Sequence, residues 1–234
     1  MCFVLINSYS STTHKTQETQ RTQKTRMETI VLNLKDQTLY WKHIEAAAQA
    51  LKMGELVAFP TETVYGLGAR RDDTKAIERI YEVKNRHEEK RLTLMIADPD
   101  DVKKYVDHIS DTAKRLMSLF WPGALAIVFP LKNGSDMSIR LPDNAVARDL
   151  IRAVELPIVT TSANISGHPP ATDAQQVLMD LGGKIHMILD GGSTRLRSSS
   201  TVLKVKDDTI EIVRHGIITE SIIRSCLENS LAKV

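Results

Sequence analysis

From residue 27 onward, short apolar runs alternate with stretches in which apolar residues recur every three or four positions. The first pattern is typical of buried strands and the second of amphipathic helices. It predicts helices over residues 41–53, 74–84, 99–108 and 110–120, another capped by Thr172 or Asp173, and a last one from Thr219. It predicts strands just after Met27 and over residues 56–59, 92–97, 125–131, 137–139, 157–161, 185–190, 202–205 and 210–214.

This alternation indicates one α/β domain over residues 27–234, with helices packed on a twisted sheet. The last two strands read as a hairpin around Asp207 and Asp208, so we expect a mixed sheet. Residues 1–26 are rich in Ser, Thr, Gln, Lys and Arg and lack apolar periodicity, which predicts a disordered basic tail.

Composition narrows the class of protein. Of the 234 residues, 42% are hydrophobic and 26% charged, and no apolar run reaches the ~20 residues that a membrane span needs. Cys2 and Cys226 stand at opposite ends, which excludes a disulfide framework and favours a reducing compartment, the cytoplasm. The basic, acid-poor tail leaves two alternatives open: an organellar targeting segment, or an over-extended start.

Charge is unevenly distributed along the chain. The net charge is +2, of which the tail contributes +3, so residues 27–234 carry −1. That near-neutral body lacks the basic balance of a dedicated nucleic-acid binder. An anion site would therefore need a local gathering of basic residues.

Five polar segments follow predicted elements, where open α/β sheets commonly bind ligands. Two are loops rich in Thr, Ser and Gly, at residues 60–68 and 160–167, and a third runs from residue 190 to 201. The other two are basic: residues 84–91 hold Lys84, Arg86, Lys90 and Arg91, and Arg214 ends the hairpin. Arg140 ends a further strand. Each segment alone could be a turn, a capped loop or a solvated helix end, but together they predict a site for a phosphorylated small molecule.

Competing chemistries find little support. The histidines are dispersed without zinc-site spacing, and there is no GxSxG, GxxxxGK[ST] or GxGxxG motif. Catalysis would then rest on positioning and on electrostatic stabilisation of phosphate charge.

The same segments resemble the YrdC-like family of threonylcarbamoyl-AMP synthases, in its short, single-domain form. The matching residues, in order, are 60–68, Lys84-x-Arg86, 121–123, 139–142, Ser162-x-Asn164 with 166–167, 190–192, 200–202 and Arg214-x-Gly216. The resemblance implies a twisted α/β sheet enclosing one positively lined cavity. It also implies the synthesis of threonylcarbamoyl-adenylate and pyrophosphate from L-threonine, bicarbonate and ATP, with Mg²⁺. A partner transferase would pass the product to tRNA.

By resemblance, the family's polar signature of catalysis would be Lys84, Arg86, Ser162 and Asn164. ATP would be held by Arg86, Lys90, Ser162 and Arg214, and threonine by Thr63, Arg140, Thr160 and Ser200. The metal ligands stay unassigned, since substrate phosphates and water could supply them.

Several positions depart from the family pattern without removing the signature. They are His87, Arg91, Met95, Ala124, Pro170, Arg197 and His215. These departures bear on loop shape and substrate preference. Two other functions remain open: a non-catalytic paralogue that binds structured RNA or nucleotide, and a carbamoyl-adenylate-forming domain for metal-centre maturation, against which the absence of zinc-finger and acylphosphatase-like segments argues.

Overall fold

The computed structural model describes residues 28–231 except residues 88, 207 and 208. The predicted tail over residues 1–26 and the turn of the predicted hairpin lie outside the described residues. None of the helices in the described part of the chain has both the length and the apolar character needed to cross a lipid bilayer.

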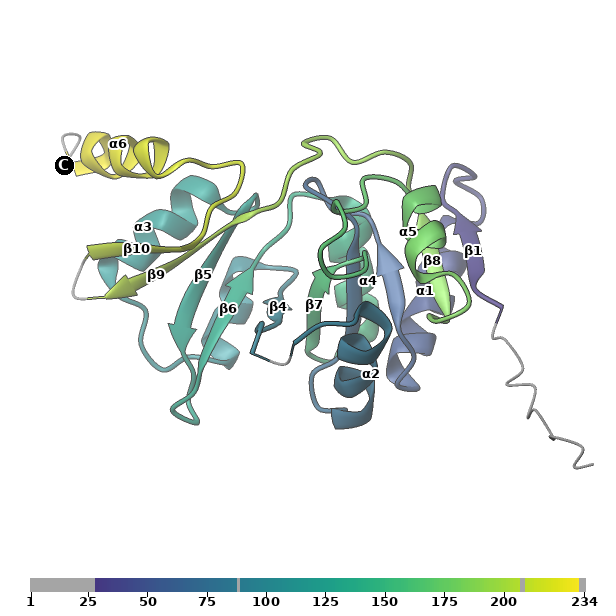
Figure 1. The fold of residues 1–234 in the computed structure, drawn as a ribbon. Coiled ribbons are helices and arrows are strands. Elements are labelled where there is room, and N and C mark those ends of the chain that lie inside the picture. Colours follow the sequence, from purple (N-terminus) through teal and green to yellow (C-terminus); the bar gives the residue numbers. More distant parts are fainter. Residues whose placement is uncertain (1–27, 88, 207–208, 232–234) are drawn as a thin grey trace, which may run out of the picture.

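One mixed sheet of ten strands runs through the described part of the molecule, in the order β1-β8-β2-β3-β7-β4-β6-β5-β9-β10 (Figure 1). β2–β3, β3–β7, β7–β4, β6–β5 and β9–β10 are antiparallel, and the other neighbours are parallel. The bounds are β1 Ile30–Asn33, β2 Val57–Phe59, β3 Gly66–Arg70, β4 Thr93–Met95, β5 Leu125–Pro130, β6 Asp136–Arg140, β7 Ile158–Ser162, β8 Met187–Asp190, β9 Thr201–Lys206 and β10 Thr209–Arg214. The prediction of a mixed α/β sheet is confirmed.

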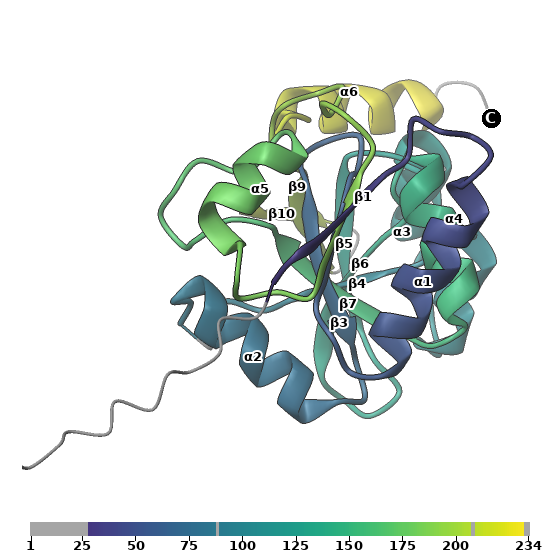
Figure 2. The same ribbon diagram turned by 90° about the vertical axis from the view of Figure 1, so that its right-hand side faces the viewer.

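Helices cover both faces of this sheet, as Figure 2 shows with α2 and α5 on one side and α1 and α4 on the other. α3 and α6 pack together near β5, β9 and β10, where the Arg115 guanidinium donates to Ser230 Oγ at 2.6 Å. The bounds are α1 Tyr40–Lys52, α2 Thr74–Lys84, η1 Pro99–Lys104, α3 Asp111–Phe120, α4 Ala145–Val154, α5 Ala174–Leu181 and α6 Glu220–Leu231.

Strand alternation divides the core into two layers, because successive side chains of a strand point to opposite faces. In β2, Val57 and Phe59 pack with α1 and α4, whereas Ala58 packs on the other side with α2 and α5. Every residue of β2 is buried. The prediction of a buried strand at residues 56–59 is therefore confirmed, with the strand itself over Val57–Phe59.

The helix predicted over residues 99–108 is wrong in type and length. Residues 99–104 form a single 3-10 helix, η1, which begins with a capping box between Asp98 and Asp101. The chain then leaves the helix because the Tyr105 carbonyl accepts from Lys132 N at 3.1 Å and is unavailable to a further helical turn.

Two elements were absent from the sequence-based prediction. α4 has a clear signal in retrospect: Asn144 Oδ1 caps Ala147 N at 3.1 Å, and Ala147, Leu150, Ile151 and Val154 form its buried stripe. β3 reads in the sequence as a glycine-rich turn. Its Gly68 instead lets the strand lie against the Phe59 ring, where an added Cβ would come within 2.9 Å of the ring edge.

The segment after β10 passes very close to the start of β9. A Cβ on Gly216 would lie 2.3–2.5 Å from backbone atoms of Ser200 and Thr201. We expect Gly216→Ala to lower the free energy of unfolding by about 1–3 kcal/mol, as overpacking does. Urea unfolding checks this. Gly66→Ala is the matched control, since its Cβ would meet nothing nearer than 3.7 Å; an equal loss in both variants would contradict the steric explanation.

Candidate functional site

An open cavity lies among the four adjacent strands β3, β7, β4 and β6, and the empty space within it, part of which is open to solvent, is about 430 Å³. Two arginines are the only charged residues in its described wall. The segment between β8 and β9, which crosses the top of the sheet in Figure 1, closes another side. Its lining is Thr61, Thr63, Val64, Tyr65, Gly66, Thr93, Met95, Arg140, Thr160, Thr161, Ser162, Ser199, Ser200 and Arg214.

Arg140, the last residue of β6, is held by three fixed acceptors. Its Nη2 donates to Glu62 Oε1 at 2.7 Å and to Thr63 Oγ1 at 2.9 Å, and its Nε donates to Gly123 O at 3.1 Å. Arg140 and Glu62 are 4% and 2% exposed, so this is a buried ion pair. A buried pair costs desolvation and keeps its geometry only when further hydrogen bonds satisfy both groups.

The turn between β2 and β3 supplies Thr63 to the same wall. Thr61 Oγ1 donates to Val64 O at 2.7 Å and lies 2.9 Å from Thr63 Oγ1. Both threonines are buried, and this side-chain-to-backbone bond fixes the turn. Thr160, on β7, is also buried and donates to Thr93 O at 3.2 Å.

Lys84 lies behind the cavity wall at the C-terminal end of α2. It is 1% exposed, and its Nζ donates to the backbone carbonyls of Ser162 and Asn164. Burial, with a further contribution from the positive charge of Arg86, lowers the pKa of Lys84 to about 7. Lys84 therefore holds the turn that follows β7, and it is not among the residues that line the cavity.

Asn164 stands in that turn with its amide group directed at the backbone. Its Nδ2 donates to Ile165 O at 2.9 Å and to His168 O at 2.8 Å. Asp180 of α5 braces the same loop, accepting from Ile165 N at 2.9 Å and pairing with His168 Nδ1 at 3.0 Å. The buried Asn164 Oδ1 and Ser166 Oγ have no hydrogen-bond partner in the described part of the chain.

The basic segment after α2 does not contribute to the lining of the cavity. Arg86 is half-buried, and its guanidinium donates to Lys90 O at 3.1 Å and to Arg91 O at 3.2 Å. These hydrogen bonds close the loop that follows α2. Burial lowers the pKa of Arg86. Lys90 is exposed. Neither Arg86 nor Lys90 lines the cavity itself.

Arg214 completes the site from β10. Its Nη2 donates to Ser200 O at 2.8 Å and to Ser200 Oγ at 2.9 Å. The residue as a whole is exposed, but its guanidinium is partly buried against the cavity; that burial, together with the positive charges of Arg140 and Arg86, lowers the pKa of Arg214. The guanidiniums of Arg140 and Arg86 therefore repel that of Arg214, and a bound anion would relieve that repulsion.

The structure brings the predicted site residues into three groups. Thr63, Arg140, Thr160, Ser162, Ser200 and Arg214 meet in the cavity wall; Lys84 and Asn164 lie behind it; Arg86 and Lys90 lie beside it. Whether they bind substrates is untested and stays a prediction.

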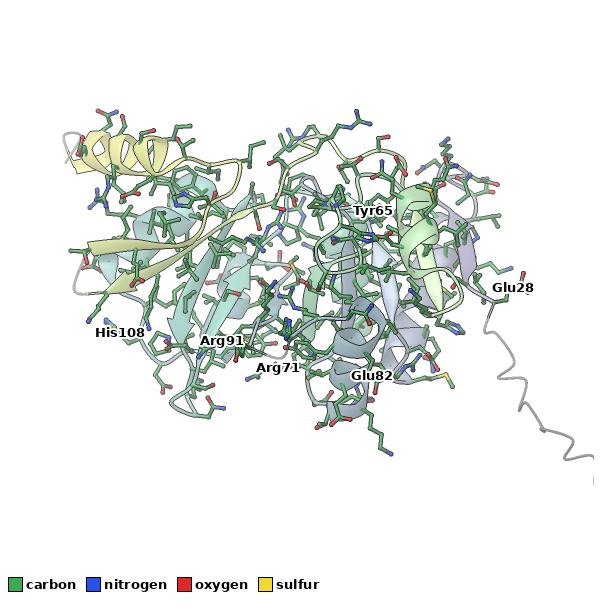
Figure 3. The ribbon with its side chains drawn as sticks, viewed as in Figure 1. Glu28, Tyr65, Arg71, Glu82, Arg91 and His108 are labelled. Carbon is green, nitrogen blue, oxygen red and sulfur yellow. The ribbon has the colours of Figure 1, made fainter. Side chains whose placement is uncertain are left out.

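Sequence reasoning missed two polar residues next to the cavity. Glu62 was grouped with its loop and given no role, although it is the partner of Arg140. Tyr65, on the α5 side in Figure 3, donates to Gly192 O at 2.8 Å and accepts from Gly191 N at 3.2 Å, which ties the segment after β8 to the wall. A single glutamate or tyrosine within a motif has no spacing or periodicity in the sequence that indicates its partner. The partner is identified only by the contact in the folded structure.

The segment after β8 contains a departure whose geometry is now visible. Arg197, where the family pattern has glycine, has φ of 50°, in the left-handed region that favours glycine. Arg195, two residues earlier, pairs with Asp143 Oδ2 at 2.6 Å on the surface. The segment thus keeps a glycine-like bend with a side chain present.

The donors around this cavity do not suit a metal ion. No Asp or Glu lines it, and within the described ranges no group of three or more His, Cys, Asp and Glu side chains is placed to hold one. Mg²⁺ prefers carboxylate and water oxygens. The wall is instead built for an anion, with two guanidiniums and several hydroxyl groups.

The fold and this cavity define an α/β protein whose strands surround a cavity lined by two arginines and several hydroxyl groups. A family model that covers Sua5, YciO and YrdC, described as "Telomere recombination", matches residues 49–216. The chain belongs to this family.

Individual relatives support this family membership. The chain is 42% identical over 194 residues to the threonylcarbamoyl-AMP synthase of Bacillus subtilis, and 40% identical over 197 residues to that of Pyrococcus abyssi. These matches cover 79% and 80% of this chain, which spans only 56% and 58% of the two relatives. The structure of Pyrococcus abyssi Sua5 complexed with L-threonine superposes with a TM-score of 0.79 at 37% identity, covering 85% of this chain and 61% of that one.

The buried Lys84 ammonium makes stability depend on pH. Its pKa is about 7 in the folded protein and ~10.4 in an unfolded chain. Between these values the unfolded chain binds more protons, so stability rises with pH there. We expect the free energy of unfolding, relative to Lys84→Met, to rise by about 1–2 kcal/mol from about pH 7.5 to about pH 9.

Urea unfolding at the two pH values measures this difference. Lys52→Met, at the end of α1 with its ammonium 3.7 Å from Glu155, serves as the control for removing a lysine at the surface. If the free energy of unfolding of wild type, relative to that of Lys84→Met, falls or stays level as the pH rises, Lys84 is not a buried amine with a lowered pKa.

Proposed function

We propose that this chain is a threonylcarbamoyl-AMP synthase, which joins L-threonine, bicarbonate and ATP to form threonylcarbamoyl-adenylate and pyrophosphate. The observation that carries the proposal is the cavity wall, where two guanidiniums and several hydroxyls stand without a lining carboxylate. It is supported by family membership and by the relative whose structure was determined with L-threonine. The chain spans just over half of its curated relatives, so the activity is assigned from this region alone.

The threonine subsite is proposed at the inner end of the cavity. Arg140 would bind the amino-acid carboxylate by a charge-assisted hydrogen bond. Thr63, Thr160 and Ser200 line the same space and would contact the rest of the amino acid. Met95 also lines this space, so part of the subsite is apolar.

The ATP subsite is proposed toward Arg86, Lys90, Ser162 and Arg214. The chemistry needs no protein nucleophile: the threonine amine condenses with bicarbonate to form a carbamate, with loss of one water molecule. A carbamate oxygen then attacks the α-phosphorus, and the bond to pyrophosphate breaks. Arg86 and Arg214 would stabilise the negative charge that develops on the phosphates. Lys84 and Asn164 would act by shaping the turn that carries Ser162.

Mg²⁺ is not assigned to protein ligands, because the residues of the cavity do not fit it. Any Mg²⁺ would arrive on the phosphates of the nucleotide as part of the substrate. The product would pass to a threonylcarbamoyl-transferase that modifies tRNA, and the proposed compartment is the cytoplasm.

Pyrophosphate release from ATP, with bicarbonate and Mg²⁺ present, tests the proposal. We expect release that depends on L-threonine and is at least ~10-fold slower with L-serine, since one methyl group in a fitted pocket contributes about that discrimination. ATP binding without threonine-dependent release would overturn the proposal and favour a paralogue that binds nucleotide or structured RNA.

Arg86 is the first residue to test in that assay. We expect Arg86→Ala to lower turnover by at least ~10²-fold, because a charge-stabilising donor would be lost in the transition state. Arg79→Ala is a suitable control, as Arg79, in the middle of α2, pairs with Glu55 at 3.1 Å and does not line the cavity. Turnover within twofold of wild type would remove Arg86 from the mechanism.

Arg140 should affect one substrate more than the other. Arg140→Lys keeps the charge that Glu62 needs but loses the fixed guanidinium geometry. We expect the KM for threonine to rise at least ~10-fold and the KM for ATP to change less than ~3-fold. Steady-state kinetics with each substrate varied in turn provides the measurement, and an equal rise in both constants would show that Arg140 does not belong to the threonine subsite.

A further inference from the structure

Glu62 is buried beside the cavity and does not line it. Its Oε1 accepts from Arg140 Nη2 at 2.7 Å, whereas the buried Oε2 has no hydrogen-bond partner among the described residues. Its backbone carbonyl accepts from Leu196 N at 2.8 Å. The side chain thus directs its charge at one guanidinium.

The hydrogen bonds of Arg140 determine which of its donors a ligand can use. Nε is bonded to Gly123 O, and the two N–H groups of Nη2 are taken by Glu62 and Thr63. Arg140 lines the cavity, and no group in the described structure accepts from its Nη1. The two N–H groups of Nη1 are therefore left for a ligand.

We propose that Glu62 is a positioning residue, which fixes the Arg140 guanidinium so that Nη1 faces the carboxylate of the amino-acid substrate. This inference rests on the proposed function, because it assigns Arg140 to the threonine subsite. Glu62 would not touch substrate. Hydrogen bonds to Nε and Nη2 restrict the rotamers of the long Arg140 side chain. The conformational entropy of this side chain is therefore lost on folding and not each time a substrate binds.

Charge and geometry make opposite contributions, so the test must separate them. The negative charge of Glu62 repels a substrate carboxylate, whereas its hydrogen bond orients the group that attracts it. Glu62→Asp keeps the charge and withdraws the carboxylate by about one methylene length. Glu62→Gln removes the charge but keeps an oxygen acceptor at the same reach.

Binding of L-threonine and of L-threoninamide, which lacks the carboxylate charge, is measured by calorimetry for each variant. In wild type we expect the amide to bind ~10–100-fold more weakly, as loss of a hydrogen bond to a charged group implies. In Glu62→Asp this ratio should fall to ~3-fold or less, with threonine itself bound at least ~10-fold more weakly. In Glu62→Gln the ratio should remain at least ~10-fold.

Two controls exclude a general loss of structure. Glu55→Asp shortens a comparable glutamate, whose partner Arg79 lies outside the cavity, and should leave the ratio unchanged. Binding of ATP within twofold of wild type shows that the site of Glu62→Asp is intact. If Glu62→Asp does not fold, Glu62→Gln decides. Its oxygen acceptor has the same reach as the glutamate's, so a ratio of threonine to threoninamide affinity that falls to ~3-fold or less in this variant overturns the proposal that a hydrogen bond from residue 62 positions Arg140.

The outcomes also distinguish this inference from the proposed function. Threonine binding in wild type with an unchanged or larger ratio in Glu62→Asp overturns the positioning role alone. No threonine binding in wild type overturns both.

Discussion

The buried ion pair between Glu62 and Arg140 joins two parts of the sheet that are distant in sequence. Glu62 belongs to the turn between β2 and β3, and Arg140 ends β6, three strands away from β3. The pair forms only when β7 and β4 are in register between them. Because an unpaired charge at either position would be costly, the pairing restricts how these strands can assemble.

This pair leaves part of the positive charge in and around the cavity without a neutralising carboxylate. The Glu62 carboxylate offsets the charge of Arg140, but Arg86 and Arg214 have no carboxylate partner among the described ion pairs. They donate instead to backbone carbonyls and a hydroxyl, which satisfies their N–H groups without neutralising them. A protein that gathers cations this way is less stable without its anion, and gains affinity for one.

Much of the fold could be predicted because its elements carry local signals. Asp173 caps α5 as expected, since its Oδ1 accepts from Gln176 N at 2.9 Å, and the apolar run at residues 56–59 is a buried strand. Prediction failed where tertiary contacts overrode local pattern. Residues 105–108 leave the helix because Lys132 takes the Tyr105 carbonyl, and the glycines of β3 suit a strand only because Phe59 needs the space.

The sequence by itself determined the types of group available: hydroxyls, arginines and small residues at the ends of predicted elements, in an order that resembles one family. Tertiary structure alone decided which of them meet. Arg140 and Glu62 are separated by 78 residues, and so are Lys84 and Ser162. Such contacts leave no local periodicity, because they depend on strand order and register. The tertiary structure alone reveals that Lys84 holds a turn in place, whereas Arg140 and Arg214 line the cavity.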